Sequence, residues 1–144
     1  MQPNDSTHPY AALHVDPVGP GDKRPTAMQI IADENLENKL VGKVILVTGA
    51  SSGIGVETVR ALHATGADVY MQVREASKGE AIRSRILSSS PGSGKLEIIG
   101  MDLSSFDSVR AGARDFLEKS ERLDVLVNNA GQSSRLIANQ YARS

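Results

Sequence analysis

A glycine-rich turn at residues 48–55, with the sequence TGASSGIG, constrains the fold of this chain more than any other feature. An apolar run, VILV at 44–47, comes directly before it, and a segment with helical periodicity follows it. A continuous apolar run is typical of a parallel strand that is buried on both faces. Where a strand turns through glycines into a helix, backbone N–H groups point at the turn and can bind phosphate. The segment therefore predicts a site for a phosphate-bearing cofactor.

Each glycine of the turn has an expected role. Gly49 permits the tight exit from the strand, Gly53 leaves room for a pyrophosphate, and Gly55 lets the helix pack close to the sheet. The spacing is G-x-x-x-G-x-G, which alone often marks only a turn, but the strand before it and the helix after it favour phosphate binding. Serine hydroxyls add further donors. The predicted cofactor-binding residues of this turn are Gly49, Ser51, Ser52, Gly53, Ile54 and Gly55.

Beyond the turn, the chain alternates strand-like and helix-like segments. Apolar runs near 68–73, 96–101 and 125–127 predict three more strands, and periodic segments between the strands predict three helices. Strand-helix-strand connections of this kind are right-handed and give a parallel sheet with helices on both sides. The predicted fold is therefore α/β, a Rossmann-like doubly wound parallel sheet, incomplete with about four strands in the order 3-2-1-4.

Local signals predict where the helices begin and which faces they bury. The pairs Ser77–Glu80 and Ser104–Asp107 have the spacing of capping boxes. Gly66 is expected to end the first helix. The expected inward faces are Ile54, Thr58, Ala61, Leu62 and Thr65 in the first helix, and Phe106, Val109, Ala113, Phe116 and Leu117 in the third.

The composition divides the chain into four regions. Five of the six prolines lie in the first 25 residues, so residues 1–24 are predicted to be a disordered lead. Residues 25–41 are predicted to be a short amphipathic helical lead-in that lies against the domain, with a partner-binding helix as the alternative. Residues 42–131 form the dinucleotide-binding half, and 132–144 form an atypical tail.

The ends of the second and third strands carry two further candidate contacts. Many NAD-binding folds place an acidic residue after the second strand for the ribose hydroxyls, whereas this chain has Arg74. A guanidinium can pair with a 2′-phosphate, so NADP(H) is favoured over NAD(H), although Glu75 beside it weakens the argument. Asp102 and Leu103 lie where an adenine ring is expected. Asp102 is predicted either to accept a hydrogen bond from the adenine amino group or to serve only as a helix N-terminal charge.

A second motif, NNAG at 128–131, follows the fourth predicted strand. Small residues at the carboxyl end of a strand beside the first strand let a flat ligand approach the backbone, and asparagine amides can bridge neighbouring strands. The predicted cofactor contacts here are Asn129, Ala130 and Gly131.

The bulk composition excludes several other functions. Sixteen basic and seventeen acidic side chains give a net charge of -1 without a Lys/Arg run, so no nucleic-acid partner is expected. Cysteine is absent, and the histidines at 8, 14 and 63 are too scattered for a metal site and are predicted to lie on the surface. No stretch approaches the length of a membrane span. A cytoplasmic protein with no membrane partner is the expectation.

Together, TGASSGIG at 48–55 and NNAG at 128–131 resemble the two cofactor-side motifs of the short-chain dehydrogenase/reductase family. KVILV at 43–47, Arg74 and Asp102-Leu103 are also similar to members related to retinol dehydrogenases and WW-domain oxidoreductases. The resemblance covers about residues 40–131. It implies an NADP(H)-dependent oxidoreductase that transfers hydride between the nicotinamide and a small carbonyl or alcohol substrate.

The same resemblance implies a catalytic serine, tyrosine, lysine and asparagine, all of them downstream of residue 144. None is carried over here, and Tyr141 is interpreted as a tail residue because it follows Gly131 too closely. The chain is therefore expected to be a truncated cofactor-binding half that catalyses nothing alone, with substrate bound only in a full-length form. The alternatives are a non-catalytic dinucleotide-binding module and a non-functional truncated product. Residues 125–127 would form an exposed sheet edge, which predicts self-association.

Overall fold

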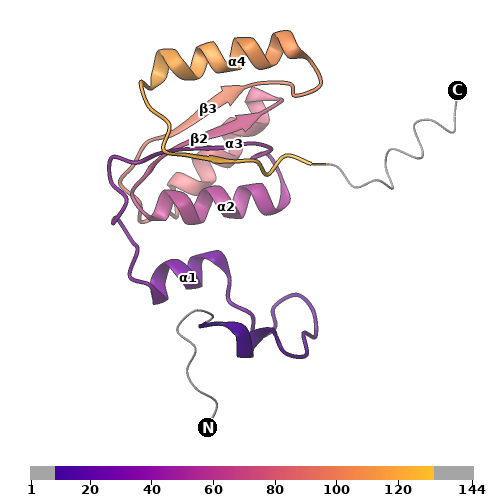
Figure 1. Cartoon of the computed structure of the whole chain (residues 1–144), viewed down its shortest axis with the longest axis vertical. Helices are drawn as coiled ribbons and strands as arrows, with labels where there is room; N and C mark the ends of the chain where they lie inside the picture. Colours follow the sequence, from indigo (N-terminus) through magenta and orange to yellow (C-terminus); the bar gives the residue numbers. More distant parts are fainter. Residues whose placement is uncertain (1–8, 132–144) are drawn as a thin grey trace, which may run out of the picture.

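The computed structural model describes residues 9–131, which form a four-stranded parallel sheet with helices on both faces (Figure 1). The strand order is β3-β2-β1-β4, which confirms the order predicted from the sequence. In chain order the elements are the 3-10 helix η1 (Ala11–His14), α1 (Ala27–Asp33), β1 (Val44–Val47), α2 (Gly53–Ala64), β2 (Asp68–Val73), α3 (Ala76–Leu87), β3 (Leu96–Gly100), α4 (Phe106–Lys119) and β4 (Val125–Val127).

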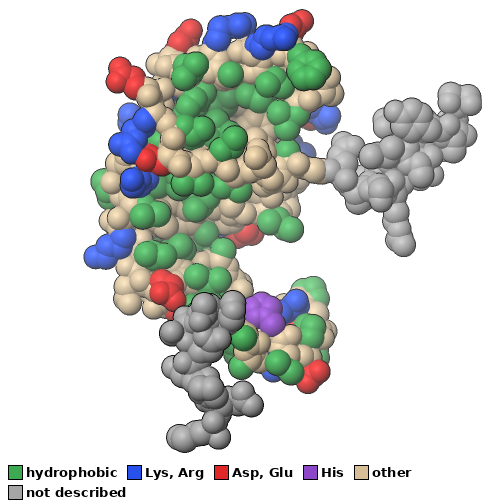
Figure 2. Space-filling view, in the orientation of Figure 1, with side chains coloured by type: hydrophobic (Ala, Val, Ile, Leu, Met, Phe, Trp, Pro, Cys, Tyr) green, Lys and Arg blue, Asp and Glu red, His purple; other side chains and the backbone are tan. Residues whose placement is uncertain are grey.

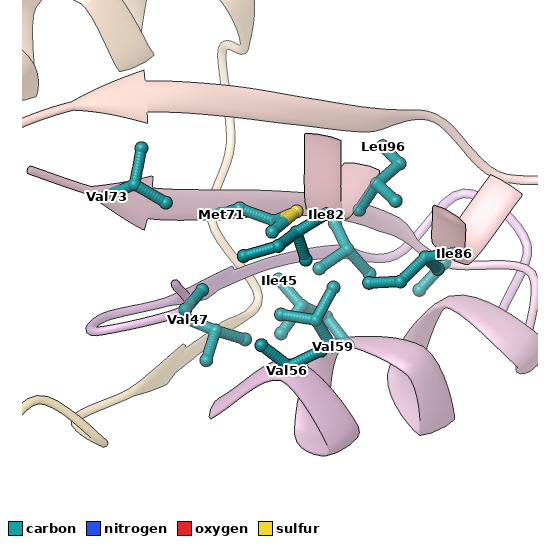
Figure 3. Packing of buried hydrophobic residues seen from close by; sticks show 12 residues of the cluster. Ile45, Val47, Val56, Val59, Met71, Val73, Ile82, Ile86 and Leu96 are labelled. Atoms are coloured by element: carbon teal, nitrogen blue, oxygen red, sulfur yellow. The ribbon is translucent and has the colours of Figure 1, made fainter. Parts of the chain in front are cut away.

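Alternation along the strands divides the core into two layers. On one face, strand residues such as Ile45 and Met71 pack against α2 and α3 through Val59 and Ile86 (Figure 3). On the other face, Tyr70 and its neighbours pack against α4 alone. The second layer consists of Val44, Leu46, Tyr70, Ile99, Met101 and Phe116. All four residues of β1 are buried, as the apolar run predicts.

The strand β4 lies at the edge of the sheet and pairs with β1, in a register that sets Ile45 opposite Val125. Its residues Val125 and Leu126 remain 45% and 50% exposed. Hydrophobic side chains gather on the face between α4 and the sheet (Figure 2). The sequence prediction that this strand forms an exposed edge therefore agrees with the structure.

Asp124 fixes the start of β4 against β1. Its backbone N–H donates to the carbonyl oxygen of Val44 at 2.9 Å, and its Oδ2 accepts a hydrogen bond from the Val44 N–H at 2.8 Å. Arg122 and Lys43 make ion pairs with its Oδ1. The Val44 N–H, followed by the Arg122 side chain, lowers the pKa of Asp124 to about 2.

The lead-in before β1 packs on the outer side of α2. Ile31 of α1 is buried against Ala61 and Ala64 of α2, and Met28 and Leu36 pack around the same contact. The helix α1 ends at Asp33 and does not continue to residue 40 as the periodicity suggests.

The early end of α1 is explained by two asparagines that follow it. Asn35 and Asn38 both adopt a positive φ of 52°, a conformation that interrupts a helix and that asparagine tolerates better than most residues.

Within residues 9–24 the chain forms η1 and a turn around Asp22, whose carboxylate accepts hydrogen bonds from the N–H groups of Val18, Gly19 and Arg24. The disorder predicted for 1–24 stays a prediction. Residues 1–8 and the predicted tail at 132–144, with Tyr141, lie outside the described residues.

Several local predictions are corrected by the structure. Ile54 is 80% exposed and Phe106 is 82% exposed, so neither belongs to an inward face. Leu117 is also exposed, at 66%. The helix α3 begins after Glu75 with no side-chain cap, so there is no capping box at Ser77. The buried residues of α2 are Gly55, Val56, Val59, Ala61, His63 and Ala64, of which Val56 and Val59 face the sheet and Ala61 and Ala64 face α1.

His63 is buried, contrary to the predicted surface position, with 1% of its surface exposed. The loop at 88–95 folds over the end of α2 and supplies both of its partners. Ser90 Oγ lies 2.6 Å from Nδ1 and the Gly94 carbonyl oxygen lies 2.9 Å from Nε2. A buried imidazole is stable when both ring nitrogens are hydrogen-bonded in this way.

Candidate cofactor-binding site

A cleft of about 730 Å³ lies at the carboxyl ends of the strands, where ligands bind in open α/β sheets. Every predicted site residue except Gly53 lines it, although these residues come from four separate segments of the chain. The lining residues that the sequence predicted are Gly49, Ser51, Ser52, Ile54, Gly55, Arg74, Asp102, Leu103, Asn129, Ala130 and Gly131. Their contact with a cofactor stays a prediction. The exposure of Ile54 follows from its place in this cleft.

Two glycines of the turn are required by close contacts. A Cβ atom on Gly49 would lie 2.7 Å from the Cα of Ala130, and Gly49 has a φ of +66°. A Cβ on Gly55 would lie 2.4 Å from the carbonyl oxygen of Gly49 and 2.7 Å from Asn129 Nδ2. Such separations are far below van der Waals contact, so any side chain at either position would push the two motifs apart.

Gly53 differs from these two glycines. Its φ is +54°, and a Cβ there would meet no atom within 4 Å. It begins α2, and the side chain of the N-cap residue Ser52 makes no capping hydrogen bond. The first amides of α2 are therefore left without a side-chain cap, and uncapped amides at a helix N-terminus can bind phosphate.

Thr48 and Asn129 join the two motifs by hydrogen bonds between side chain and backbone. Thr48 Oγ1 accepts from the N–H groups of Asn129 and Ala130, at 3.1 Å and 3.0 Å. Asn129 Nδ2 in turn donates to the carbonyl oxygens of Thr48 and Gly49, at 2.9 Å and 3.2 Å. The prediction that an asparagine amide bridges neighbouring strands thus describes Asn129. Thr48 was not predicted as a site residue.

Asp102 organises the loop between β3 and α4. Its Oδ1 accepts hydrogen bonds from the Ser104 hydroxyl at 2.7 Å and the Ser104 N–H at 2.9 Å. These bonds, with a smaller contribution from Arg74, lower the pKa of Asp102. The cap of α4 is Ser105, and the acidic residue of its first turn is Asp107. Asp102 lies three residues before this cap, outside the first turn of α4, and both roles expected for it stay predictions.

Positive charge enters the cleft from the end of β2 and the start of α3. The Arg74 side chain is 70% exposed, and its Nη2 lies 3.8 Å from Glu75 Oε1. Lys78, in the first turn of α3, lines the same cleft. The sequence interpretation rested on Arg74 alone and missed Lys78. Lys78 lies four residues after Arg74, in the first turn of the next helix, and this position beside the strand end is the signal that could have identified it.

Further lining residues were also missed. Gln72, Met101 and Ser104 line the cleft, and Gln72 is buried with 3% of its surface exposed. A polar residue inside the apolar strand DVYMQV was a readable signal for Gln72.

Among residues 9–131, no group of acidic or histidine side chains could hold a metal ion. Within the same range, no helix has the length and apolar character needed to cross a membrane.

A parallel sheet whose first strand turns through glycines into a helix, with a cleft at the carboxyl strand ends, defines a dinucleotide-binding domain of the Rossmann class. The model of the short chain dehydrogenase family matches residues 43–143. The chain therefore belongs to the short-chain dehydrogenase/reductase family, which confirms the resemblance of the two motifs.

Two curated relatives illustrate the range of the match. The short-chain dehydrogenase/reductase prx1 of Penicillium roqueforti is 46% identical over 122 residues, which is 85% of this chain and 35% of the relative. Human retinol dehydrogenase 11 is 43% identical over 93 residues, 65% of this chain and 29% of the relative. The chain thus spans about a third of the length of these proteins. Only 102 residues lie from Lys43 to Ser144, so the fungal match includes at least 20 of the residues that precede Lys43.

Solved structures agree with this assignment. A metagenomic short-chain oxidoreductase in complex with NADP has a TM-score of 0.58 and 41% identity, covering 65% of this chain and 41% of that chain. The RhlG/NADP active-site complex of Pseudomonas aeruginosa has a TM-score of 0.57 and 39% identity, covering 65% of this chain and 35% of that chain.

Proposed function

We propose that this chain is the NADP(H)-binding half of a short-chain oxidoreductase that interconverts a small carbonyl compound and its alcohol. The observation that carries the proposal is the contact between the glycine turn and Asn129. This contact lies in the same cleft that Arg74 and Asp102 line. Family membership supports the oxidoreductase class. The bound nicotinamide would supply the hydride, and the described residues would hold and orient the dinucleotide.

The arrangement of the cleft suggests how the cofactor would lie. The turn around Gly53 has open space for the pyrophosphate beside the first amides of α2. Asp102 and Leu103 would flank the adenine, where the carboxylate oxygen would accept from its amino group. Asn129, Ala130 and Gly131 would lie under the nicotinamide end, and the lack of bulky side chains there lets a flat ring approach the backbone. No described residue is assigned a catalytic role.

Arg74 and Lys78 favour NADP(H) over NAD(H). Both cations line the cleft, and a 2′-phosphate brings about two negative charges to which a guanidinium can make paired hydrogen bonds. Glu75 competes for Arg74, but their ion pair is exposed and long at 3.8 Å, so it is weak. Both of the solved structures described above contain NADP, which supports this choice.

The cofactor proposal is tested by titrating NADPH and NADH into the wild-type chain and into Arg74→Asp by calorimetry. Arg74→Asp should lower the ratio of NADPH to NADH affinity by about tenfold or more, because it replaces a charge-assisted bond with repulsion. The matched control is Arg110→Asp, which changes an exposed arginine of α4 outside the lining of the cleft. An unchanged ratio in Arg74→Asp would reject the NADP assignment, and failure of the wild type to bind either nucleotide would reject the proposed function.

We also propose that copies of the chain self-associate through the edge strand β4. Within residues 9–131 its outer edge has no strand partner, and its residues Val125 and Leu126 are 45% and 50% exposed. Unpaired apolar edges pair with other chains. Analytical ultracentrifugation should show concentration-dependent association that Leu126→Lys reduces. The control Val18→Lys changes a residue that is 89% exposed and far from β4 in the sequence. A wild-type chain that stays monomeric at high concentration would disprove the association.

A further inference from the structure

Gln72 occupies a position where the strand pattern calls for an apolar side chain. Its neighbours Met71 and Val73 point from β2 toward the α2 and α3 side (Figure 3). Alternation places Gln72 on the opposite face, two residues after Tyr70, which belongs to the apolar layer under α4. Only 3% of Gln72 is exposed. A buried primary amide is costly unless it is hydrogen-bonded, so its partners explain why it is tolerated.

The side-chain amide of Gln72 reaches both walls of the cleft, the glycine turn that begins at Thr48 and the loop that carries Asp102. Its Oε1 accepts a hydrogen bond from the backbone N–H of Gly49 at 2.8 Å, which fixes the glycine turn. Its Nε2 donates to the backbone carbonyl oxygen of Met101 at 2.5 Å, at the start of the loop that carries Asp102. A single side chain thus spans from the expected pyrophosphate wall to the expected adenine wall.

Backbone hydrogen bonds on both sides of Gln72 hold its side-chain amide in line with its two partners. The carbonyl oxygen of Gln72 accepts from the Ala50 N–H at 3.0 Å, so Gln72 contacts two successive amides of the turn. Val73, the next residue, accepts from the Met101 N–H at 2.9 Å. The amide of glutamine combines an acceptor for Gly49 and a donor for Met101 in one planar group of this length. An ionised glutamate would keep the acceptor and lose the donor.

We propose that Gln72 is a positioning residue that sets the separation of the two walls of the cleft and thereby the fit of the dinucleotide. The expected effect on dinucleotide binding rests on the proposed function. The expected effect on the Gly49 hydrogen bond concerns the protein without cofactor and does not. It predicts that the Gly49 amide loses its protection once the side-chain amide is removed, while the backbone bonds of Ala50 and Met101 to β2 remain.

The first experiment measures amide hydrogen exchange by NMR in the chain without cofactor, comparing wild type with Gln72→Met. Methionine has a similar length and no polar bond to offer, so exchange of the Gly49 amide should rise about tenfold. The Ala50 amide is an internal control because it is bonded to the backbone of Gln72, and the Thr48 amide, bonded to Val127, is a second. Both should keep their protection. Equal acceleration at all three amides, or no change at Gly49, would overturn the proposal.

The second experiment uses Gln72→Glu, which also serves if Gln72→Met does not fold. This variant should keep the protection of the Gly49 amide, since a carboxyl oxygen still accepts its hydrogen bond whether or not the group is ionised. Fast exchange at Gly49 in Gln72→Glu would contradict the assignment. NADPH affinity should fall about tenfold in Gln72→Met, and an unchanged affinity would reject the positioning role. Failure of the wild-type chain to bind NADPH would instead reject the proposed function, while the exchange result still decides the geometry.

Discussion

The side chain of Asn129 donates a hydrogen bond from Nδ2 to the carbonyl oxygen of Gly49 at 3.2 Å, and the two residues are 80 positions apart in the chain. Asn129 also donates to the Thr48 carbonyl oxygen, so one amide group satisfies the first two carbonyls of the turn that follows β1. The two motifs are therefore one structural unit. A change in either should affect both stability and the shape of the cleft.

We expect Asn129→Ala to lower the free energy of unfolding by about 1 to 3 kcal/mol, because two backbone carbonyls lose their donor. Urea denaturation followed by circular dichroism measures this change. Asn128→Ala is the matched control, since Asn128 is exposed, and should change stability by less than about 0.5 kcal/mol. Equal losses in the two variants would contradict the bridging role of Asn129.

Gly55→Ala should destabilise the fold by about 1 to 3 kcal/mol through overpacking, since its Cβ would lie 2.4 Å from the Gly49 carbonyl oxygen. Gly100→Ala is the control: a Cβ there meets nothing within 4 Å, and the residue has no positive φ. Thermal melts of both variants separate the effect of the contact from that of losing a glycine. A Gly55→Ala variant as stable as wild type would show that the helix can move away without cost.

The pKa of Asp124, lowered from 3.8 to about 2, makes its contribution to stability dependent on pH. A carboxylate whose pKa is lower in the folded state stabilises the fold above its unfolded pKa, and this stabilisation is lost as pH falls through the folded pKa. The stability difference between wild type and Asp124→Asn should therefore be full above pH 4 and shrink between about pH 4 and 2. Denaturation curves across this range test the prediction, with Glu118→Gln, an exposed site, as the control. A constant difference would rule out the charge of Asp124 as the cause.

His63→Leu should cost about 2 kcal/mol or more, because Ser90 Oγ and the Gly94 carbonyl oxygen lose their partner beneath the loop at 88–95. Limited proteolysis should then cleave this loop faster. His14→Leu, at an exposed position in η1, should leave both measurements nearly unchanged. If the loop at 88–95 resists proteolysis in His63→Leu, the imidazole does not fix it.

The architecture could be predicted because it depends on patterns that are local in sequence. The apolar run at 44–47 and the glycine turn determine a strand and a helix start regardless of the rest of the chain. Gly66 ends α2 as expected, with a φ of +81°. The cap of α4 was predicted one residue early because Ser104 and Ser105 are both capable of capping, and the choice depends on Asp102 holding Ser104.

The residues that the sequence interpretation missed depend on contacts between distant segments. His63 looks like a surface histidine until the loop at 88–95 folds over it, and that loop has no periodic signal. Ile54 fits a helical stripe, but the first turn of α2 faces the cleft and not the core. Thr48 and Gln72 act through the backbone of other strands, so their roles required the register of the sheet.

The pairing of β4 has a consequence for the order in which the domain folds. β1 and β2 pair residues only 24 positions apart, whereas β1 and β4 join Ile45 to Val125 across 80 positions. Closing the longer loop costs more chain entropy and slows pairing. We expect β4 to dock late in refolding and to detach first on unfolding. Because Asn129, Ala130 and Gly131 follow β4, a chain that has folded only its first three strands would lack the part of the cleft that these residues line.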